Sequence, residues 1–262
     1  MEDVGDGRGI LYPTRLPTFH REPAPAALDG LVRWFWIPRW RLAPGRTSRQ
    51  RVLSFPASNL VVEPGGVTLA GPTTRAAHRD LRGTGWAVGA LLRPAGLASL
   101  HEEPETIRDV EVPVDAPDLH RAVTEAMEAG ADGDAVRAFV DWLGTRLAPP
   151  DEAGLLANAM EDLVASDRTV VRVDQVAERL GVSARSVQRL ARRHIGLGPL
   201  AVLRRYRLQE AAQRLREDAG VTIAQVAADL GYADQAHLAA DFRTALGGTP
   251  NAYRRDPAHP GR

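Results

Sequence analysis

The spacing of hydrophobic positions divides this chain into two parts. Between residues 26 and 112, short apolar runs at 52–55, 59–62, 67–70 and 86–92 are separated by proline, glycine, asparagine and serine. Runs with this punctuation are typical of antiparallel strands. The sequence EPGG at 63–66 lies between two of them and predicts a hairpin turn. We therefore predict a small antiparallel β barrel or sandwich, preceded by a flexible segment over residues 1–25.

From residue 113 onward the apolar positions take the spacing of helices. Two apolar faces, over 119–127 and 136–147, are joined by the sequence AGADG and predict a helical hairpin at 117–148. The prolines at 149 and 150 mark a boundary, and the next helix is expected over 155–166. The predicted fold class is α+β. The β domain with its hairpin covers 26–148, an all-α domain covers 152–256, and a tail follows at 257–262.

The all-α domain contains one structural unit twice. The sequence QVAERLG at 175–181 returns as QVAADLG at 225–231, and each copy is followed by a turn and a second amphipathic helix. Ser183 and Asp234 are good N-cap residues for these second helices, and Thr222 has capping-box spacing with Gln225. We predict helix-turn-helix units at 173–195 and 222–246, joined by a linker helix at 198–217.

The second helix of such a unit lies in the major groove when the unit binds DNA. An arginine can bind guanine through two hydrogen bonds, and a glutamine can bind adenine in the same way. The candidate base or phosphate contacts are Arg185, Gln188, Arg189 and Arg192 in the first unit and Gln235 and His237 in the second, with Arg243, Arg204 and the helix start at Thr222 as candidate phosphate contacts. The alternative for each of them is a solvated helix surface.

The sequence GYADQAHLAADFRTALGGTPNAYRR at 231–255 resembles the signature of the AraC/XylS family of bacterial transcription regulators. The first unit, the opening of the linker helix and the repeat spacing resemble that family too. Segments 54–75 and 87–100 are similar to the cupin-like sensor domains found in one branch of it. The resemblance implies double-stranded DNA as a partner, with a small-molecule effector, a homodimer and RNA polymerase as further expected partners. Ala240 stands where the family often has arginine, so the second unit is expected to discriminate bases less.

Charge is distributed unevenly although the net charge is zero. Residues 168–255 hold 15 arginines against eight acidic residues, an excess of seven positive charges that the remaining chain balances. A basic domain attached to an acidic one is typical of nucleic-acid contact by one half of a protein.

Several classes of chemistry are disfavoured by composition. The chain has no cysteine, which excludes disulfides, thiolate zinc sites and cysteine nucleophiles. Its seven histidines show no H-x-H or similar ligand spacing, so we expect no metal, no cofactor and no enzymatic activity. No signal pattern and no apolar run long enough to span a membrane are found, so a cytoplasmic protein without membrane contact is expected.

Tryptophans are concentrated in the β domain. Trp34, Trp36 and Trp86 are candidates for an aromatic effector pocket, and the alternative is that they fill the β core. Strand alternation over 33–37 places Trp34 and Trp36 on one face and Phe35 on the other, so both interpretations can hold in part.

Together these patterns predict a sequence-specific DNA-binding transcription regulator. The sequence leaves three alternatives for how the regulator is controlled: a small effector, dimerisation or a protein partner. A protein partner would require an exposed apolar patch on 117–148 and a β domain filled by its own side chains. A cupin-type enzyme fused to a DNA-binding tail would require catalytic or metal-binding residues in 25–115, and the sequence shows none.

Overall fold

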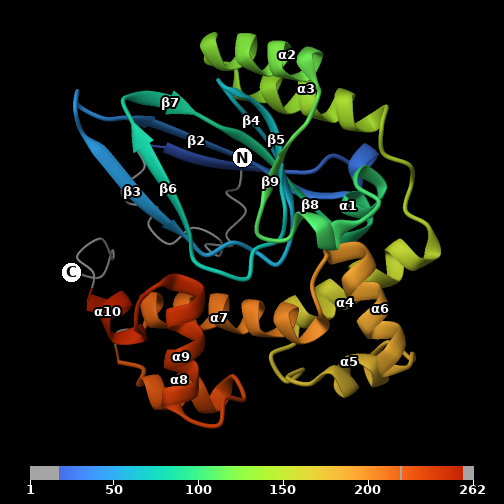
Figure 1. The fold of residues 1–262 in the computed structure, drawn as a ribbon, viewed down its shortest axis with the longest axis vertical. Helices are drawn as coiled ribbons and strands as arrows, with labels where there is room; N and C mark the ends of the chain where they lie inside the picture. Colours follow the sequence, from blue (N-terminus) through green and yellow to red (C-terminus); the bar gives the residue numbers. More distant parts are fainter. Residues whose placement is uncertain (1–17, 219, 256–262) are drawn as a thin grey trace.

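The computed structural model describes residues 18–218 and 220–255, and its two halves are stacked on each other (Figure 1). The first half contains β1 (Thr18–Pro23), β2 (Val32–Arg41), β3 (Thr47–Val52), β4 (Asn59–Glu63), β5 (Gly66–Ala70), β6 (Ala77–Arg82), β7 (Thr84–Trp86), β8 (Val88–Leu92), β9 (Glu111–Pro113), the short helices η2 (Ala26–Leu28), α1 (Pro94–Leu100) and η3 (Pro104–Ile107), and the hairpin helices α2 (Pro117–Glu128) and α3 (Asp132–Gly144). The second half consists of α4 (Glu152–Ser166), α5 (Val173–Arg179), α6 (Ala184–Ile195), α7 (Pro199–Glu217), α8 (Ile223–Asp229), α9 (Gln235–Leu246) and α10 (Pro250–Arg255). The predicted α+β class is confirmed.

The strands form one large sheet and one ribbon. The large sheet has the order β1-β2-β8-β4-β5-β9, with β7 also paired to β2, and the ribbon consists of β3 and β6. All pairs among the described strands are antiparallel. The hairpin predicted at 63–66 joins β4 to β5, with Gly66 at a φ of 141° that glycine adopts without strain.

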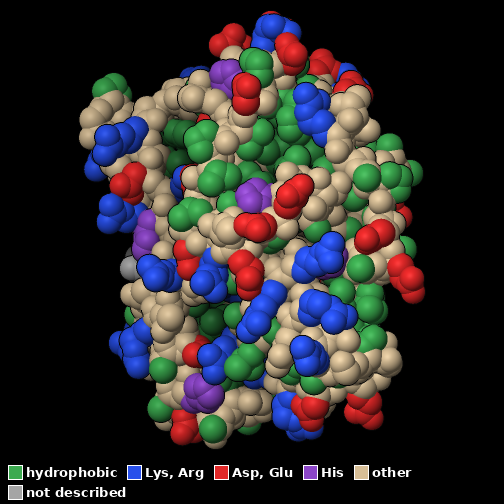
Figure 2. Space-filling view, turned by 45° about the vertical axis from the view of Figure 1, so that its right-hand side comes forward, with side chains coloured by type: hydrophobic (Ala, Val, Ile, Leu, Met, Phe, Trp, Pro, Cys, Tyr) green, Lys and Arg blue, Asp and Glu red, His purple; other side chains and the backbone are tan. Residues whose placement is uncertain are grey.

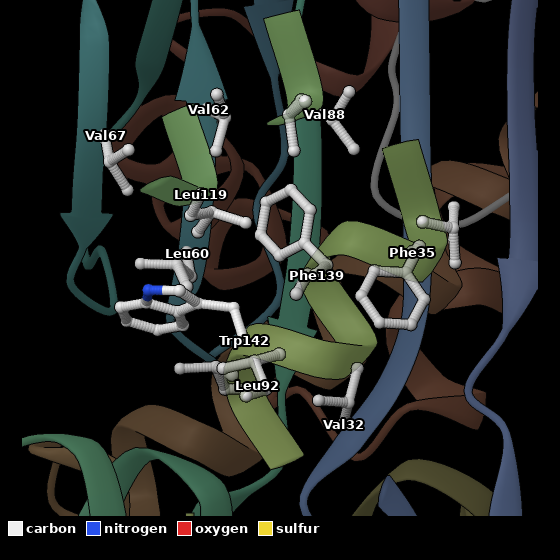
Figure 3. Close-up of a cluster of buried hydrophobic side chains, with 14 of the residues drawn as sticks. Val32, Phe35, Leu60, Val62, Val67, Val88, Leu92, Leu119, Phe139 and Trp142 are labelled. Carbon is white, nitrogen blue, oxygen red and sulfur yellow. The ribbon is translucent and has the colours of Figure 1, made fainter. Parts of the chain in front are cut away.

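One face of the large sheet forms a core with the helical hairpin, as predicted for 117–148. Figure 3 shows Phe139 and Trp142 of α3 and Leu119 of α2 lying against Phe35, Leu60 and their neighbours on the strands. Phe35, Leu60 and Phe139 are fully buried. This packing covers the apolar faces of both helices. Because each helix buries one face only, the helical spacing of its apolar residues was sufficient to locate it in the sequence.

Alternation along β2 gives the sheet two different faces. Phe35 lies in the core under α2 and α3, whereas Trp34 and Trp36 lie on the opposite face, as the sequence predicted. A register shift between Val32 and Trp34 interrupts the pairing with β8. Such a bulge redirects side chains, and here Arg33 and Trp34 both contact the helical half.

The prediction of a flexible segment over 1–25 is wrong for residues 18–23. These residues form β1, which pairs with β2 over its full length. The order comes from backbone hydrogen bonds to β2, the next strand along the chain, which the local composition of residues 1–25 did not indicate. Residues 1–17 and the predicted tail at 257–262 lie outside the described residues.

The strand predicted at 52–55 is also incorrect. The strand β3 ends at Val52, and Leu53 and Phe55 instead insert between the two halves and pack against C-terminal helices. The ribbon strands themselves, TSRQRV and AHRDLR, are too polar to show a strand pattern. The run at 86–92 is divided at Ala87 into β7 and β8, and Pro94 then begins the unpredicted helix α1.

The helical half follows its local sequence signals closely. Ser183 Oγ accepts a hydrogen bond from the Ser186 amide at 3.1 Å, and Asp234 accepts one from the His237 amide at 2.8 Å. Both helix-turn-helix units and the linker helix occur where they were predicted. Each second helix ends in a left-handed glycine, at Gly196 and Gly247. The final helix α10 was not predicted.

The two halves are joined around the buried carboxylate of Glu161 on α4. This carboxylate accepts hydrogen bonds from Arg33 Nη2 of β2 at 2.8 Å and from the Tyr206 hydroxyl of α7 at 2.9 Å. Although burial disfavours the charged guanidinium, attraction to Glu161 raises the pKa of Arg33 above its ordinary value. Next to this group, Asn158 of α4 donates to the Gly30 carbonyl and accepts from the Ala95 amide. The halves are therefore held by buried polar contacts as well as by apolar packing.

We predict that Glu161→Gln destabilises the full chain by about 3 kcal/mol, because it removes the main charge partner of the partly buried Arg33. Urea unfolding of both proteins measures the loss. Glu152→Gln, an exposed position on the same helix, is the control and should change stability by less than about 0.5 kcal/mol. Equal midpoints for the two variants would contradict a structural role for this carboxylate.

Candidate DNA-reading helices and aromatic cavity

The helix α6 presents the first set of predicted DNA contacts. Val187, Leu190 and Ala191 are buried and hold the helix against its neighbours. The outward side chains Arg185, Gln188, Arg189, Arg192 and the additional Arg193 are exposed and line one hollow of about 640 Å³. The structure therefore brings together all four predicted side chains of the first unit. Arg193 was not among the sequence candidates, although it directly follows Arg192 and is exposed on the same helix.

The helix α9 presents fewer polar groups. Gln235 and Arg243 are exposed and line a second hollow of about 360 Å³ together with Ala236 and Ala239. His237 does not line this hollow, and its ring lies edge-on to the Tyr232 ring with centroids 5.2 Å apart. The second unit thus offers one amide and one guanidinium where the first offers an amide and four guanidinium groups.

The remaining predicted phosphate contacts lie around the linker helix and α8. Arg204 is exposed on α7, with its Nε 4.0 Å from Asp241 Oδ2. The start of α8 is closed by a capping box, in which the Thr222 amide donates to Gln225 Oε1 at 2.9 Å and Thr222 Oγ1 accepts from the Gln225 amide at 3.1 Å. These two amides are already satisfied, so a phosphate there would have to use the neighbouring amides.

Basic side chains gather over the helical half of the molecule. Figure 2 shows blue side chains spread over its lower part, with red side chains bordering them from the half above. Beside α6, the acidic side chains that border the arginines are Glu102, Glu103 and Glu105 of the first half.

A cavity of about 640 Å³ lies between the sheet and the β3–β6 ribbon. Its aromatic lining consists of Phe19, Trp34, Trp36, Trp40 and Phe55, and its polar lining includes Arg21, Gln50, Asn59, Arg75, His78, Arg79, Asp109 and Glu111. Trp36 Nε1 donates to Asn59 Oδ1 at 2.9 Å. An aromatic cavity with convergent polar groups is the usual form of a small-molecule site.

Two glycines make room for the tryptophans of β2. Gly89 of β8 pairs with Trp36, and Gly85 of β7 pairs with Trp40. A Cβ atom at Gly89 would lie 2.1 Å from the Trp36 ring, and one at Gly85 would lie 2.4 Å from the Trp40 ring. The rings therefore lie across the neighbouring strands and form the cavity floor. Continued alternation from Trp36 would have identified Trp40 from sequence.

The prediction that Trp86 belongs to this pocket is wrong. Trp86 pairs with Arg39, and directly paired residues of antiparallel strands point to the same face. Arg39 contacts Met127 and Asp132 of the helical hairpin, so Trp86 packs on that side, against the core between the sheet and the hairpin. Val88, Ala90 and Leu92 of β8 belong to the same core, so alternation within the run at 86–92 also places Trp86 on that side.

One wall of the cavity is connected directly to the linker helix. Buried Arg205 of α7 donates to the carbonyls of Thr73 at 2.6 Å and Arg75 at 3.2 Å, in the segment between β5 and β6. Burial lowers the pKa of Arg205 to about 10, so this guanidinium is still charged at neutral pH.

The Asp109 carboxylate accepts three hydrogen bonds from Thr73 and Thr74. Partial burial opposes ionisation, but these bonds hold the pKa of Asp109 below its ordinary value.

Within residues 18–218 and 220–255, no group of three or more histidine, aspartate or glutamate side chains is placed to hold a metal ion. The helices in these ranges include none with the length and apolar character needed to cross a membrane.

Residues 176–256 match a helix-turn-helix domain family, and residues 20–112 match a domain family of unknown function. An AraC-like transcription regulator of Streptomyces lividans is 30% identical over 164 residues, which cover 60% of this chain and 54% of the relative. A second AraC-like regulator, of Streptomyces antibioticus, is 35% identical over 118 residues, or 42% and 39% of the two chains. The chain thus spans about half the length of the first relative. The crystal structure of ToxT from Vibrio cholerae aligns with 87% of this chain and 99% of its own, at 12% identity and a TM-score of 0.47.

We predict that Gly89→Ala destabilises the protein by about 1–3 kcal/mol, because the added methyl group overlaps the Trp36 ring. Urea unfolding followed by tryptophan fluorescence measures both the stability and the displaced ring. Gly65→Ala is the matched control, since nothing lies within 4 Å of a Cβ atom there. An unchanged midpoint and spectrum for Gly89→Ala would show that the ring does not lie on this glycine.

Proposed function

We propose that this chain, whose C-terminal residues form an AraC-type helix-turn-helix domain, is a transcription regulator that binds double-stranded DNA sequence-specifically and responds to a small molecule. The observation that supports it most is the pair of capped reading helices, α6 and α9, joined by the single linker helix α7. In this arrangement each reading helix enters one segment of the major groove. The relatives named above are regulators, and we propose no enzymatic turnover.

Base reading is assigned mainly to α6 in this proposal. Arg185, Gln188, Arg189 and Arg192 offer hydrogen-bond donors suited to guanine and adenine edges. Gln235 is the corresponding candidate on α9, while Arg243 and Arg204 are assigned to phosphates. His237 packs against Tyr232 and is therefore the weakest of the proposed contacts. The second unit would add affinity and shape recognition more than sequence discrimination.

Control by a small molecule is favoured over control by a protein partner. The described side chains of the β half leave an aromatic cavity of about 640 Å³ between them. The apolar faces of α2 and α3 are buried against the sheet, so residues 117–148 present no large exposed hydrophobic side chain to a partner. We propose a ligand with a flat apolar part, because the tryptophan rings offer planar surfaces.

Homodimer formation and contact with RNA polymerase belong to the same proposal through the family relationship. A chromosomal DNA target would place the protein in the bacterial cytoplasm.

We predict that Arg189→Ala costs roughly 1–3 kcal/mol of specific binding and relaxes the preference at one or two base pairs. A randomised-site selection with the full chain, followed by titration of the selected DNA, measures both effects. Arg137→Ala, an exposed arginine on α3, is the control and should leave the preference unchanged. Ala240→Ser should also change little. A half-site under Gln235 as sharply specified as the one under Arg189 would contradict the assignment to α6.

We predict that a cognate metabolite stabilises the full chain in a thermal-shift screen, by about 2.7 kcal/mol at 100 times its dissociation constant. Trp36→Ala should abolish the shift because it removes the cavity floor. Trp142→Ala removes a tryptophan from the core between the sheet and the helical hairpin, and this control variant should keep the ligand response. A ligand whose effect survives Trp36→Ala binds elsewhere.

A further inference from the structure

We propose that residues 102–107 form an acidic strap that competes with DNA for α6, so that the arrangement seen here excludes DNA. The inference rests on the proposed DNA-binding function and names a means of regulating it. The strap belongs to the β half, between α1 and β9, and contains the three carboxylates of Glu102, Glu103 and Glu105.

The strap and the reading side chains face the same hollow. Glu102, Glu103 and Glu105 line the space that is lined on its other side by Arg185, Gln188, Arg189, Arg192 and Arg193. Glu105 Oε1 lies 3.9 Å from Arg192 Nε. The carboxylates are exposed, so each pairing is weak by itself. Their placement nevertheless puts negative charge where a DNA phosphate or base edge would have to approach.

Apolar anchors and one glycine hold the strap in this position. Pro104 and Ile107 are buried, whereas Glu105 between them and the two glutamates before Pro104 are exposed. At the end of α6, a Cβ atom on Gly196 would lie 2.3 Å from the Pro104 carbonyl oxygen. Gly196 also has a φ of 80°, so its missing side chain serves both the helix end and this close approach.

Among residues 18–218 and 220–255, no equivalent acidic strap lies against the second unit. At its corresponding glycine, Gly247, the nearest atom of the described residues to an added Cβ is Ala76 Cβ, at an ordinary 3.9 Å. The described residues that line the hollow on α9 include no acidic side chain. The acidic segment is therefore placed selectively against the arginine-rich helix. A general acidic surface would not distinguish the two units in this way.

The strap is continuous with the wall of the aromatic cavity. Two residues after Ile107, Asp109 adopts a φ of 62° and is bound by Thr73 and Thr74, and both Asp109 and Glu111 line the cavity. Gly71, also in the lining, lies so close to the strap that a Cβ atom there would be 1.7 Å from the Ile107 carbonyl oxygen. A molecule that moves Asp109 or the segment at 71–74 would therefore also move the strap.

The test compares two variants of the full chain that each lose three negative charges. Glu102→Gln, Glu103→Gln and Glu105→Gln neutralise the strap. Asp115→Asn, Glu125→Gln and Glu128→Gln neutralise exposed acids on and before α2. Figure 1 shows α2 at the top of the molecule and α6 in the lower half. Fluorescence anisotropy with a random-sequence duplex at low salt measures binding. The strap variant should bind roughly tenfold more tightly than the unaltered chain, and the control should differ by less than about twofold.

The outcomes separate the two proposals. If the unaltered chain and the strap variant bind DNA equally well, or if the control improves as much as the strap variant, the strap is not a competitor. If none of the three proteins binds DNA, the proposed function itself fails. Amide hydrogen exchange of the unaltered chain gives a second readout that needs no substitution. Exchange in peptides covering 102–107 should rise when DNA is added, and unchanged exchange would overturn displacement of the strap.

Discussion

The relative position of the two halves depends on one buried carboxylate. Glu161 is bound by a strand of the sheet through Arg33 and by the linker helix through Tyr206, so three distant parts of the chain meet at its two oxygens. A carboxylate removed from water is costly unless its partners are in place. Such a group favours one geometry of approach over others that would bury a similar apolar area. The sheet is thereby oriented so that its tryptophan face, the strap and the linker helix all meet the helical half.

The helical half could be predicted from sequence almost completely because its signals are local. Ser183, Asp234 and Thr222 make their hydrogen bonds within three residues, and the repeat fixed the spacing of the units. The β half was predicted less well. The ribbon of β3 and β6 has no apolar alternation, and Leu53 and Phe55 owe their hydrophobic character to the other half of the molecule and not to a strand.

The cavity could be predicted only in part for the same reason. Trp34 and Trp36 were placed correctly by alternation within one strand, whereas Trp86 was misplaced because its orientation depends on its pairing with Arg39. Arg21, Asp109 and Arg205 carry no local signal for a cavity or for contact between the halves. The contacts of Asp109 and Arg205 join residues that are 36 to 132 positions apart in the sequence, which neither periodicity nor capping patterns encode.

The segment from Glu102 to Glu111 borders a reading helix at one end and the aromatic cavity at the other. If a ligand in the cavity favours release of the strap, thermodynamic linkage requires that DNA binding favour that ligand by the same factor. Binding to a promoter would then raise the affinity of the cavity for its ligand. Protein bound to its operator would then hold the small molecule at concentrations too low to saturate protein that is free of DNA. As the concentration of the small molecule falls, the DNA-bound protein would be the last to release it.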